Sequence, residues 1–174
     1  MTADFNEAAD KVFTENNYFC QYLTFILGDE VYGISINSVK EVIEFGNVTT
    51  VPMMPKFVKG VLNLRGEVVP VVDLSIRFGD LPTLIHKRSC IAILDVLFEN
   101  KKTVIGVVVD AVNDVVELQN DQIKDPPEFG AKIQAQFIQG VAHIDEHFVI
   151  ILEPDRVLSI EEMAMIIEQS SSSS

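Results

Sequence analysis

The pattern of apolar and polar positions is clearest around the dipeptide Arg65-Gly66, which two mostly apolar runs flank. A β-prone run at residues 60–64 precedes this dipeptide, and a second run at residues 67–74 follows it. A glycine in the second position of a two-residue turn readily takes a positive φ, so the pattern predicts a tight β-hairpin. Pairing outward from the turn places Leu64 opposite Glu67, Leu62 opposite Val69 and Val61 opposite Pro70.

Both faces of this predicted hairpin carry apolar side chains, whereas a half-buried hairpin has one apolar and one polar face. Pro70 lacks the N–H of an ordinary strand residue and therefore indicates an edge strand or a bulge. Two interpretations of the tip remain open. In one, the rest of the domain covers the hairpin and Arg65 is simply solvated. In the other, the hairpin receives another protein and Arg65 supplies a planar, rigidly held donor.

Short strands are also predicted before this hairpin. Residues 22–27 and 31–36 have strand patterns, and residues 28–30 form the turn between them. Ser38 is expected to cap a short helical turn before residues 42–45 extend again.

The two ends of the chain have different patterns. Residues 1–17 are polar and acidic, which predicts a mobile arm or a short helix. Ser159 and Glu162 have the spacing of a capping box, so a helix is expected at residues 159–169. The serine run at residues 170–174 is expected to be disordered.

The strongest organising signal is an internal repeat. Residues 31–45 resemble residues 104–118, and residues 57–61 resemble residues 137–141. A shared order of apolar, glycine and acidic positions over this length indicates a duplication. The matched positions include Gly33 with Gly106, Val39 with Val112, Glu41 with Asp114, Glu44 with Glu117, and Gly60 with Gly140.

The repeat predicts the architecture. Each copy offers about five short strands with regularly spaced turns, as in a small closed or nearly closed barrel. A lobe of about 70 residues is marginally stable alone, so the two barrels are expected to pack together. We therefore predict one mainly β domain at residues 18–169, with lobes at about 18–85 and 86–158 and a short C-terminal helix. Arg65-Gly66 corresponds to Asp145-Glu146, so the turn itself does not require arginine.

Composition narrows the function classes. The chain has 13 Lys and Arg against 26 Asp and Glu, a net charge of −13. Such a charge repels phosphate backbones and anionic membrane surfaces, so no nucleic acid partner is expected. No apolar run approaches the ~18 residues of a membrane span, and the N-terminus has no signal-peptide pattern, so no membrane insertion is expected.

Candidate chemistry is sparse. His143 and His147 are four residues apart, but the repeat puts them at a hairpin tip, where their side chains diverge, and no third ligand is evident. Cys20 and Cys90 are expected to be buried free thiols. Phosphate-loop, nucleophile-elbow and zinc-protease motifs are absent from the sequence. We therefore expect neither an enzyme nor a cofactor site.

The segment at residues 57–74 resembles the signature of the CheW-like family, and residues 32–42 and 105–116 fit the same family. The similarity covers roughly residues 18–168. It implies two intertwined five-stranded SH3-like barrels, which agrees with the repeat. It also implies a non-enzymatic adaptor that bridges the histidine kinase CheA to the cytoplasmic tips of methyl-accepting chemotaxis receptors.

The resemblance further implies a cytoplasmic protein that is recruited to membrane-associated receptor arrays and controls kinase activity. The positions carried over for receptor binding are Ile36, Val39, Glu41, Val42, Arg65, Val107 and Val109. Those carried over for the regulatory domain of the kinase are Gly60, Asn63, Leu64 and Arg65.

Two alternatives stay open at this point. A CheW-like adaptor of a non-flagellar chemosensory array would show the same sequence features. A small metal-binding protein that uses His143 and His147 would require a stoichiometric bound ion.

Overall fold

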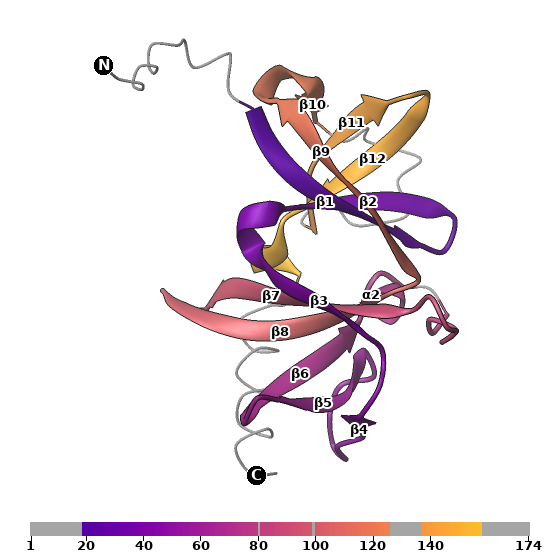
Figure 1. Cartoon of the computed structure of the whole chain (residues 1–174), viewed down its shortest axis with the longest axis vertical. Coiled ribbons are helices and arrows are strands. Elements are labelled where there is room, and N and C mark those ends of the chain that lie inside the picture. Colours follow the sequence, from indigo (N-terminus) through magenta and orange to yellow (C-terminus); the bar gives the residue numbers. More distant parts are fainter. Residues whose placement is uncertain (1–18, 80, 99, 126–136, 158–174) are drawn as a thin grey trace.

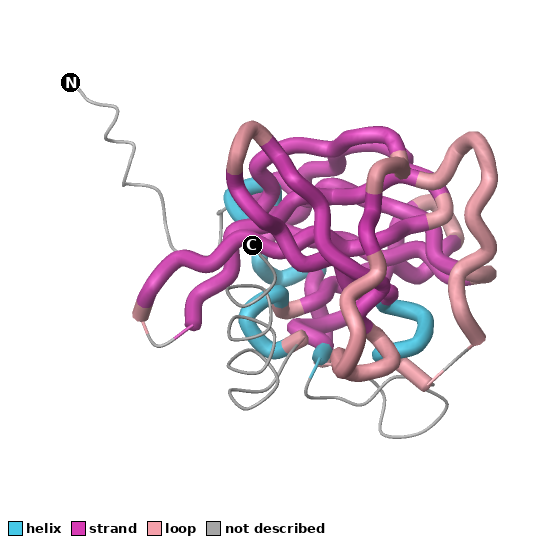
Figure 2. Tube along the Cα trace, turned by 90° about the horizontal axis from the view of Figure 1, so that it is seen from below, coloured by secondary structure: helices cyan, strands magenta, loops and turns pink. Residues whose placement is uncertain are grey.

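The computed structural model describes residues 19–79, 81–98, 100–125 and 137–157. The arm expected at residues 1–17, the helix expected at 159–169 and the tail at 170–174 lie outside the described residues. Within the described residues, strands dominate and helical turns are short (Figure 2). The predicted mainly β class is confirmed.

The strands form two six-stranded sheets, one above the other in Figure 1. We call the lower sheet the first barrel; its strand order is β3-β7-β8-β6-β5-β4. Five strands per barrel were expected, and the two-residue strand β4 makes the sixth. The strands of the first barrel are β3 (Val39–Glu44), β4 (Val48–Thr49), β5 (Val58–Leu64), β6 (Glu67–Asp73), β7 (Cys90–Phe98) and β8 (Lys101–Val109).

The upper sheet, which we call the second barrel, has the strand order β10-β11-β12-β2-β1-β9. Its short additional strand is β10, the counterpart of β4. The strands are β1 (Phe19–Leu27), β2 (Glu30–Ser35), β9 (Ala111–Gln119), β10 (Ile123–Lys124), β11 (Ile138–Ile144) and β12 (His147–Leu152). The helical turns are η2 (Ile36–Ser38), α2 (Leu74–Arg77), η3 (Asn120–Gln122) and η5 (Pro154–Arg156).

Each barrel contains strands from both copies of the repeat. The first barrel takes β3–β6 from the first copy and the hairpin β7–β8 from the second, whereas the second barrel takes β1–β2 and β9–β12. The lobes expected at 18–85 and 86–158 therefore describe the sequence repeat and not the sheets. The sheets differ from the lobes because the first hairpin of each copy pairs with strands of the other copy.

Two parallel strand pairs make this exchange. In the first barrel Val71 of β6 lies opposite Gly106 of β8, and in the second barrel Ile151 of β12 lies opposite Gly33 of β2. A Cβ on Gly106 would lie 2.8 Å from Cγ2 of Ile91, so the interior leaves no room for a larger residue there. The paired glycines of the repeat thus occupy equivalent places, as the duplication predicts.

The predicted central hairpin is present with the predicted register, from Leu64 opposite Glu67 to Val61 opposite Pro70. Both turn residues have positive φ, 52° at Arg65 and 86° at Gly66, as in a type I′ turn. The matching turn of the second barrel uses Asp145 and Glu146, with φ of 48° and 66°.

Pro70 lies in a strand with neighbours on both sides. It causes no break because the parallel register with β8 begins only at Val71. The predicted bulge occurs instead in the partner strand β5, between Val58 and Gly60.

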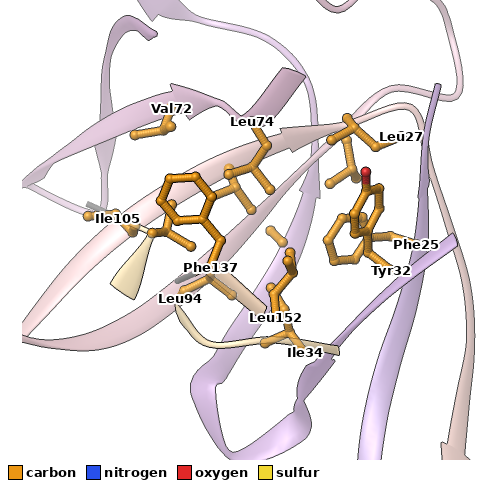
Figure 3. Packing of buried hydrophobic residues seen from close by; sticks show 14 of the residues in the cluster. Phe25, Leu27, Tyr32, Ile34, Val72, Leu74, Leu94, Ile105, Phe137 and Leu152 are labelled. Atoms are coloured by element: carbon orange, nitrogen blue, oxygen red, sulfur yellow. The ribbon is translucent and has the colours of Figure 1, made fainter. Parts of the chain in front are cut away.

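Three apolar clusters hold the fold together. One fills each barrel, and the largest lies between the barrels and draws on both (Figure 3). Each fully buried aliphatic or aromatic side chain contributes roughly 1.5–3 kcal/mol relative to exposure. The labelled residues of this shared core are Phe25, Leu27, Tyr32, Ile34, Val72, Leu74, Leu94, Ile105, Phe137 and Leu152.

Two local expectations were wrong. The helical turn η2 begins earlier than expected and is capped by Ser35, whose Oγ accepts a hydrogen bond from the N–H of Asn37, while Ser38 is its last residue. Cys20 is exposed because it lies near the start of β1, outside the covered part of the strand, and Cys90 is half-buried; both thiols are free. Among the described residues, no helix is long and apolar enough to cross a membrane.

The first prediction concerns Gly60. A Cβ at this position would overlap the backbone carbonyl of Thr49 in β4. Gly60→Ala should therefore destabilise the protein by about 1–3 kcal/mol in a urea melt, the usual cost of overpacking. Gly46→Ala is the matched control because a Cβ there would meet no atom within 4 Å. Equal melting of the two variants would contradict the assigned packing of β4 on β5.

Candidate protein-binding surface

Apart from Arg65, the receptor-binding positions expected in the first copy lie on and before β3, an edge strand of the first barrel. Alternate residues of β3 are exposed and half-buried. Val42 is 38% exposed, whereas Val39 packs partly against the shared core. Ile36 lies in the preceding turn η2 and is half-buried. Val42 is therefore the apolar position of this group that is most available to a partner.

Arg65 and Glu41 form a bidentate ion pair across two elements. The guanidinium donates hydrogen bonds of 2.6 Å and 2.8 Å to the two carboxylate oxygens of Glu41. The pair joins the tip of the β5–β6 hairpin to β3. The Arg65 side chain is nevertheless 71% exposed, against 27% for Glu41. Arg65 is therefore not simply solvated, but neither is it hidden from a partner.

The pair shifts the titration of both groups. The hydrogen bonds from Arg65 hold the pKa of the Glu41 carboxyl below its ordinary value, and the carboxylate raises the pKa of Arg65. Since folding lowers the pKa of Glu41, the contribution of its carboxylate to folding stability is present at neutral pH and is lost as the pH falls through the lowered pKa. Exposed pairs add little stability, but bidentate geometry fixes the orientation of both side chains.

The expected kinase-facing positions have three different environments. Asn63 is exposed, and its Oδ1 accepts a 2.9 Å hydrogen bond from the N–H of Gly66, which holds the turn. Leu64 is half-buried beside the core of the first barrel. Gly60 is buried under β4, so it cannot itself contact a partner. Close packing against the neighbouring short strand explains why both copies of the repeat have a glycine at this position.

Val107 and Val109, expected on the opposite side of the receptor site, have no exposed surface. Both lie in β8 within the shared core. We therefore remove them from the binding surface. They are carried over by position from the family resemblance, and the local pattern gives no warning, because β-branched residues in a strand look the same whether they face a partner or another sheet.

Sequence reasoning missed the counterpart of Val42 in the second copy. Val115 lies on β9, the edge strand of the second barrel, and is 47% exposed. It pairs with Leu23 of β1 as Val42 pairs with Ala92 of β7. The offset of 73 residues that aligns Glu41 with Asp114 also aligns Val42 with Val115, so the repeat contained this signal.

The histidines of the metal-site alternative lie on opposite faces of the β11–β12 hairpin. His143 pairs with Phe148 and Ile144 pairs with His147, and adjacent strand residues point to opposite sides. The ring of His143 stacks on Phe148 with centroids 4.9 Å apart. The two imidazoles cannot therefore share one ion, and the part of the chain that is described has no group of three metal-ligating side chains.

Comparison with known proteins agrees with this architecture. The CheW-like domain model matches residues 21–162. The chain belongs to the CheW-like family. The Chemotaxis protein CheW of Klebsiella aerogenes is 35% identical to it over 146 residues, which cover 84% of this chain and 86% of that protein.

A second relative, Protein FrzA of Myxococcus xanthus, is 33% identical over 132 residues, which cover 73% of this chain and 74% of that protein. Among solved structures, the scaffolding protein TtCheW of Thermoanaerobacter tengcongensis superposes with a TM-score of 0.74. The two sequences are 32% identical, and the matched region covers 83% of this chain and 91% of the TtCheW chain.

The second prediction concerns the ion pair. Arg65→Met should return the pKa of the Glu41 carboxyl toward its ordinary value, because it removes both hydrogen bonds that favour the charged form. An NMR titration of the Glu41 side-chain carboxyl measures this. Arg88→Met, an exposed arginine outside the pair, is the control and should leave the titration unchanged. An unchanged Glu41 titration in Arg65→Met would mean that the pair does not persist in solution.

Proposed function

We propose that this protein is a non-enzymatic adaptor that couples methyl-accepting chemotaxis receptors to the histidine kinase CheA and thereby controls kinase activity. The proposal rests on membership of the CheW-like family and on the names of its relatives, which include a chemotaxis protein and a scaffolding protein. In this proposal the protein works in the cytoplasm and is recruited to membrane-associated receptor arrays. It needs no cofactor, because its role is to hold two partners together.

The observation that carries the proposal is the bidentate pair of Arg65 and Glu41. It joins an edge strand to a hairpin tip on the surface, and the next residue of that strand, Val42, presents an exposed side chain on the other face. Inside a solitary domain such a pair adds little to stability. On a binding surface it holds an exposed guanidinium in one orientation, and ordered arginines of this kind are common interface anchors.

For the receptor we assign the edge strands of both barrels. Val42 on β3 and Val115 on β9 are equivalent, exposed and apolar. In Figure 1 both edge strands cross the near side of the view. A helical receptor tip presents an apolar stripe that fits β-branched side chains on such strands, with Glu41 and Arg65 at the margin. Ile36 and Val39 support this surface from partly buried positions.

For the regulatory domain of the kinase we assign the tip of the β5–β6 hairpin. Asn63 and Leu64 precede the turn, and Arg65 forms its first residue. The type I′ turn makes this tip rigid, so little conformational freedom is lost when it binds. Arg65 then belongs to both surfaces, which places the kinase contact next to the receptor contact.

An adaptor of a non-flagellar chemosensory array fits the same surfaces, and the receptors recovered with the protein would distinguish the two systems. The decisive experiment is an affinity purification from cells that express the tagged chain. Recovery of a histidine kinase together with receptors supports the proposal. Recovery of neither from cells in which both are present would refute it.

The third prediction tests the receptor surface. Val42→Asp and Val115→Asp should each weaken binding of a receptor tip fragment by about tenfold or more, because each buries a charge in an apolar contact. Leu84→Asp, which changes an 83% exposed leucine in the linker before β7, is the matched control and should bind normally. Calorimetric titration measures all three. Val39 is a poorer test because it packs against the shared core.

The fourth prediction tests the hairpin tip. Arg65→Ala should lower affinity for the receptor fragment, the kinase regulatory domain or both by at least about tenfold, as truncated interface arginines commonly do. Arg65→Lys should recover only part of it, because an ammonium cannot reproduce the bidentate fork. Normal binding of Arg65→Ala to both partners would remove Arg65 from the site.

A further inference from the structure

The two halves of the molecule meet at equivalent positions around Arg77, the last residue of α2. The offset of 80 residues that relates the bulged β5–β6 hairpin to β11–β12 also relates Phe57 to Phe137 and Arg77 to Val157. Nε of Arg77 donates a 2.7 Å hydrogen bond to the carbonyl oxygen of Val157. Arg77 thus bonds to its own equivalent in the other copy, at a place where the two halves meet.

The same guanidinium lies between two equivalent aromatic rings. Its central carbon is 5.1 Å from the ring centroid of Phe57 and 4.8 Å from that of Phe137. Both distances are within the range of cation–π attraction, which strengthens when the rings are shielded from water. Both rings are buried. Phe57 directly precedes β5 of the first barrel and Phe137 directly precedes β11 of the second, so one side chain binds both barrels.

The contacts of Arg77 are asymmetric although the fold is duplicated. The second copy has a valine, Val157, where the first has Arg77, and two guanidiniums this close together would repel each other. The shared apolar core attracts the barrels without preferring one direction. A hydrogen bond and two planar ring contacts are directional, so they limit rotation of one barrel against the other.

We infer that Arg77 is a positioning residue that fixes the angle between the two barrels, and with it the separation of the edge strands β3 and β9. The inference rests on the proposed function only where it concerns a receptor that contacts both strands. A partner that contacts the β5–β6 tip alone does not depend on this angle.

The geometric test uses spin labels at Lys40→Cys on β3 and Asn113→Cys on β9, two exposed positions that the repeat relates. Cys20→Ser and Cys90→Ser remove the native free thiols. Pulsed electron paramagnetic resonance then gives the distance distribution between the labels. Arg77→Met, which keeps an apolar stem, should shift or broaden this distribution, and Arg77→Lys should do so less.

The matched control is Lys59→Met. Nζ of Lys59 lies 5.9 Å from the ring centroid of Phe45, and both residues belong to the first barrel or its margin. This cation–π contact therefore does not connect the two barrels. Its removal should leave the distribution unchanged. Urea melts of all variants confirm that folded protein is compared, and Arg77→Lys carries the test if Arg77→Met does not fold. A distribution that is identical with and without the guanidinium would overturn the inference.

The functional test titrates the same Arg77 variants, with native cysteines and no labels, against a receptor tip fragment and the kinase regulatory domain. Arg77→Met should weaken receptor binding by at least about fivefold, the lower end of typical coupling between separate sites. Kinase binding should stay within about twofold, since the whole β5–β6 hairpin lies within the first barrel and does not span the two. General destabilisation would lower both affinities together and would count against a positioning role.

The outcomes of the two experiments separate the two claims. A distance distribution that changes in Arg77→Met would support Arg77 as the positioning residue. If the unmodified protein also failed to bind the receptor fragment, the proposed receptor site would be refuted. Normal receptor binding by the unmodified protein, together with a distance distribution that Arg77→Met leaves unchanged, would support the proposed receptor site and would refute the positioning role of Arg77.

Discussion

The structure depends on two parallel strand pairs, each of which joins one copy of the repeat to the other. Val71 meets Gly106 in the first barrel and Ile151 meets Gly33 in the second. The glycines are needed because a Cβ on either would press against an interior isoleucine. By exchanging hairpins, the copies bury one large core between the barrels that neither copy makes alone. Two lobes that would each be marginally stable thus share one large core.

Duplication supplied the scaffold twice, and the surfaces then diverged. The first copy places Arg65 on the hairpin tip opposite Glu41 of β3, and they form a bidentate pair. The equivalent positions in the second copy are Asp145 and Asp114, two carboxylates that cannot pair. The turn is the same type I′ in both, so the arginine is not required by the backbone. It is on this divergent surface, and not in the shared core, that binding specificity is expected.

The structure places the residues that were singled out for the site in very different environments. Arg65 and Glu41 were both singled out, and charge complementarity brings them together. Gly60, Val107 and Val109 were also singled out, but a glycine or valine in a strand has the same pattern whether it serves packing or a partner. Burial removes all three from the surface. Val115 was overlooked, although its place in the repeat matches that of Val42.

The sequence by itself determined the mainly β class, the duplication, the central hairpin with its register, and the family, because these follow from local patterns of period two and from turn residues. The tertiary structure alone decided which strands share a sheet. Parallel pairing between β6 and β8, or between β12 and β2, joins residues far apart in the chain, and nothing in either local pattern specifies the partner. It also decided that Arg77 lies between Phe57 and Phe137, since that contact exists only after the two barrels have packed.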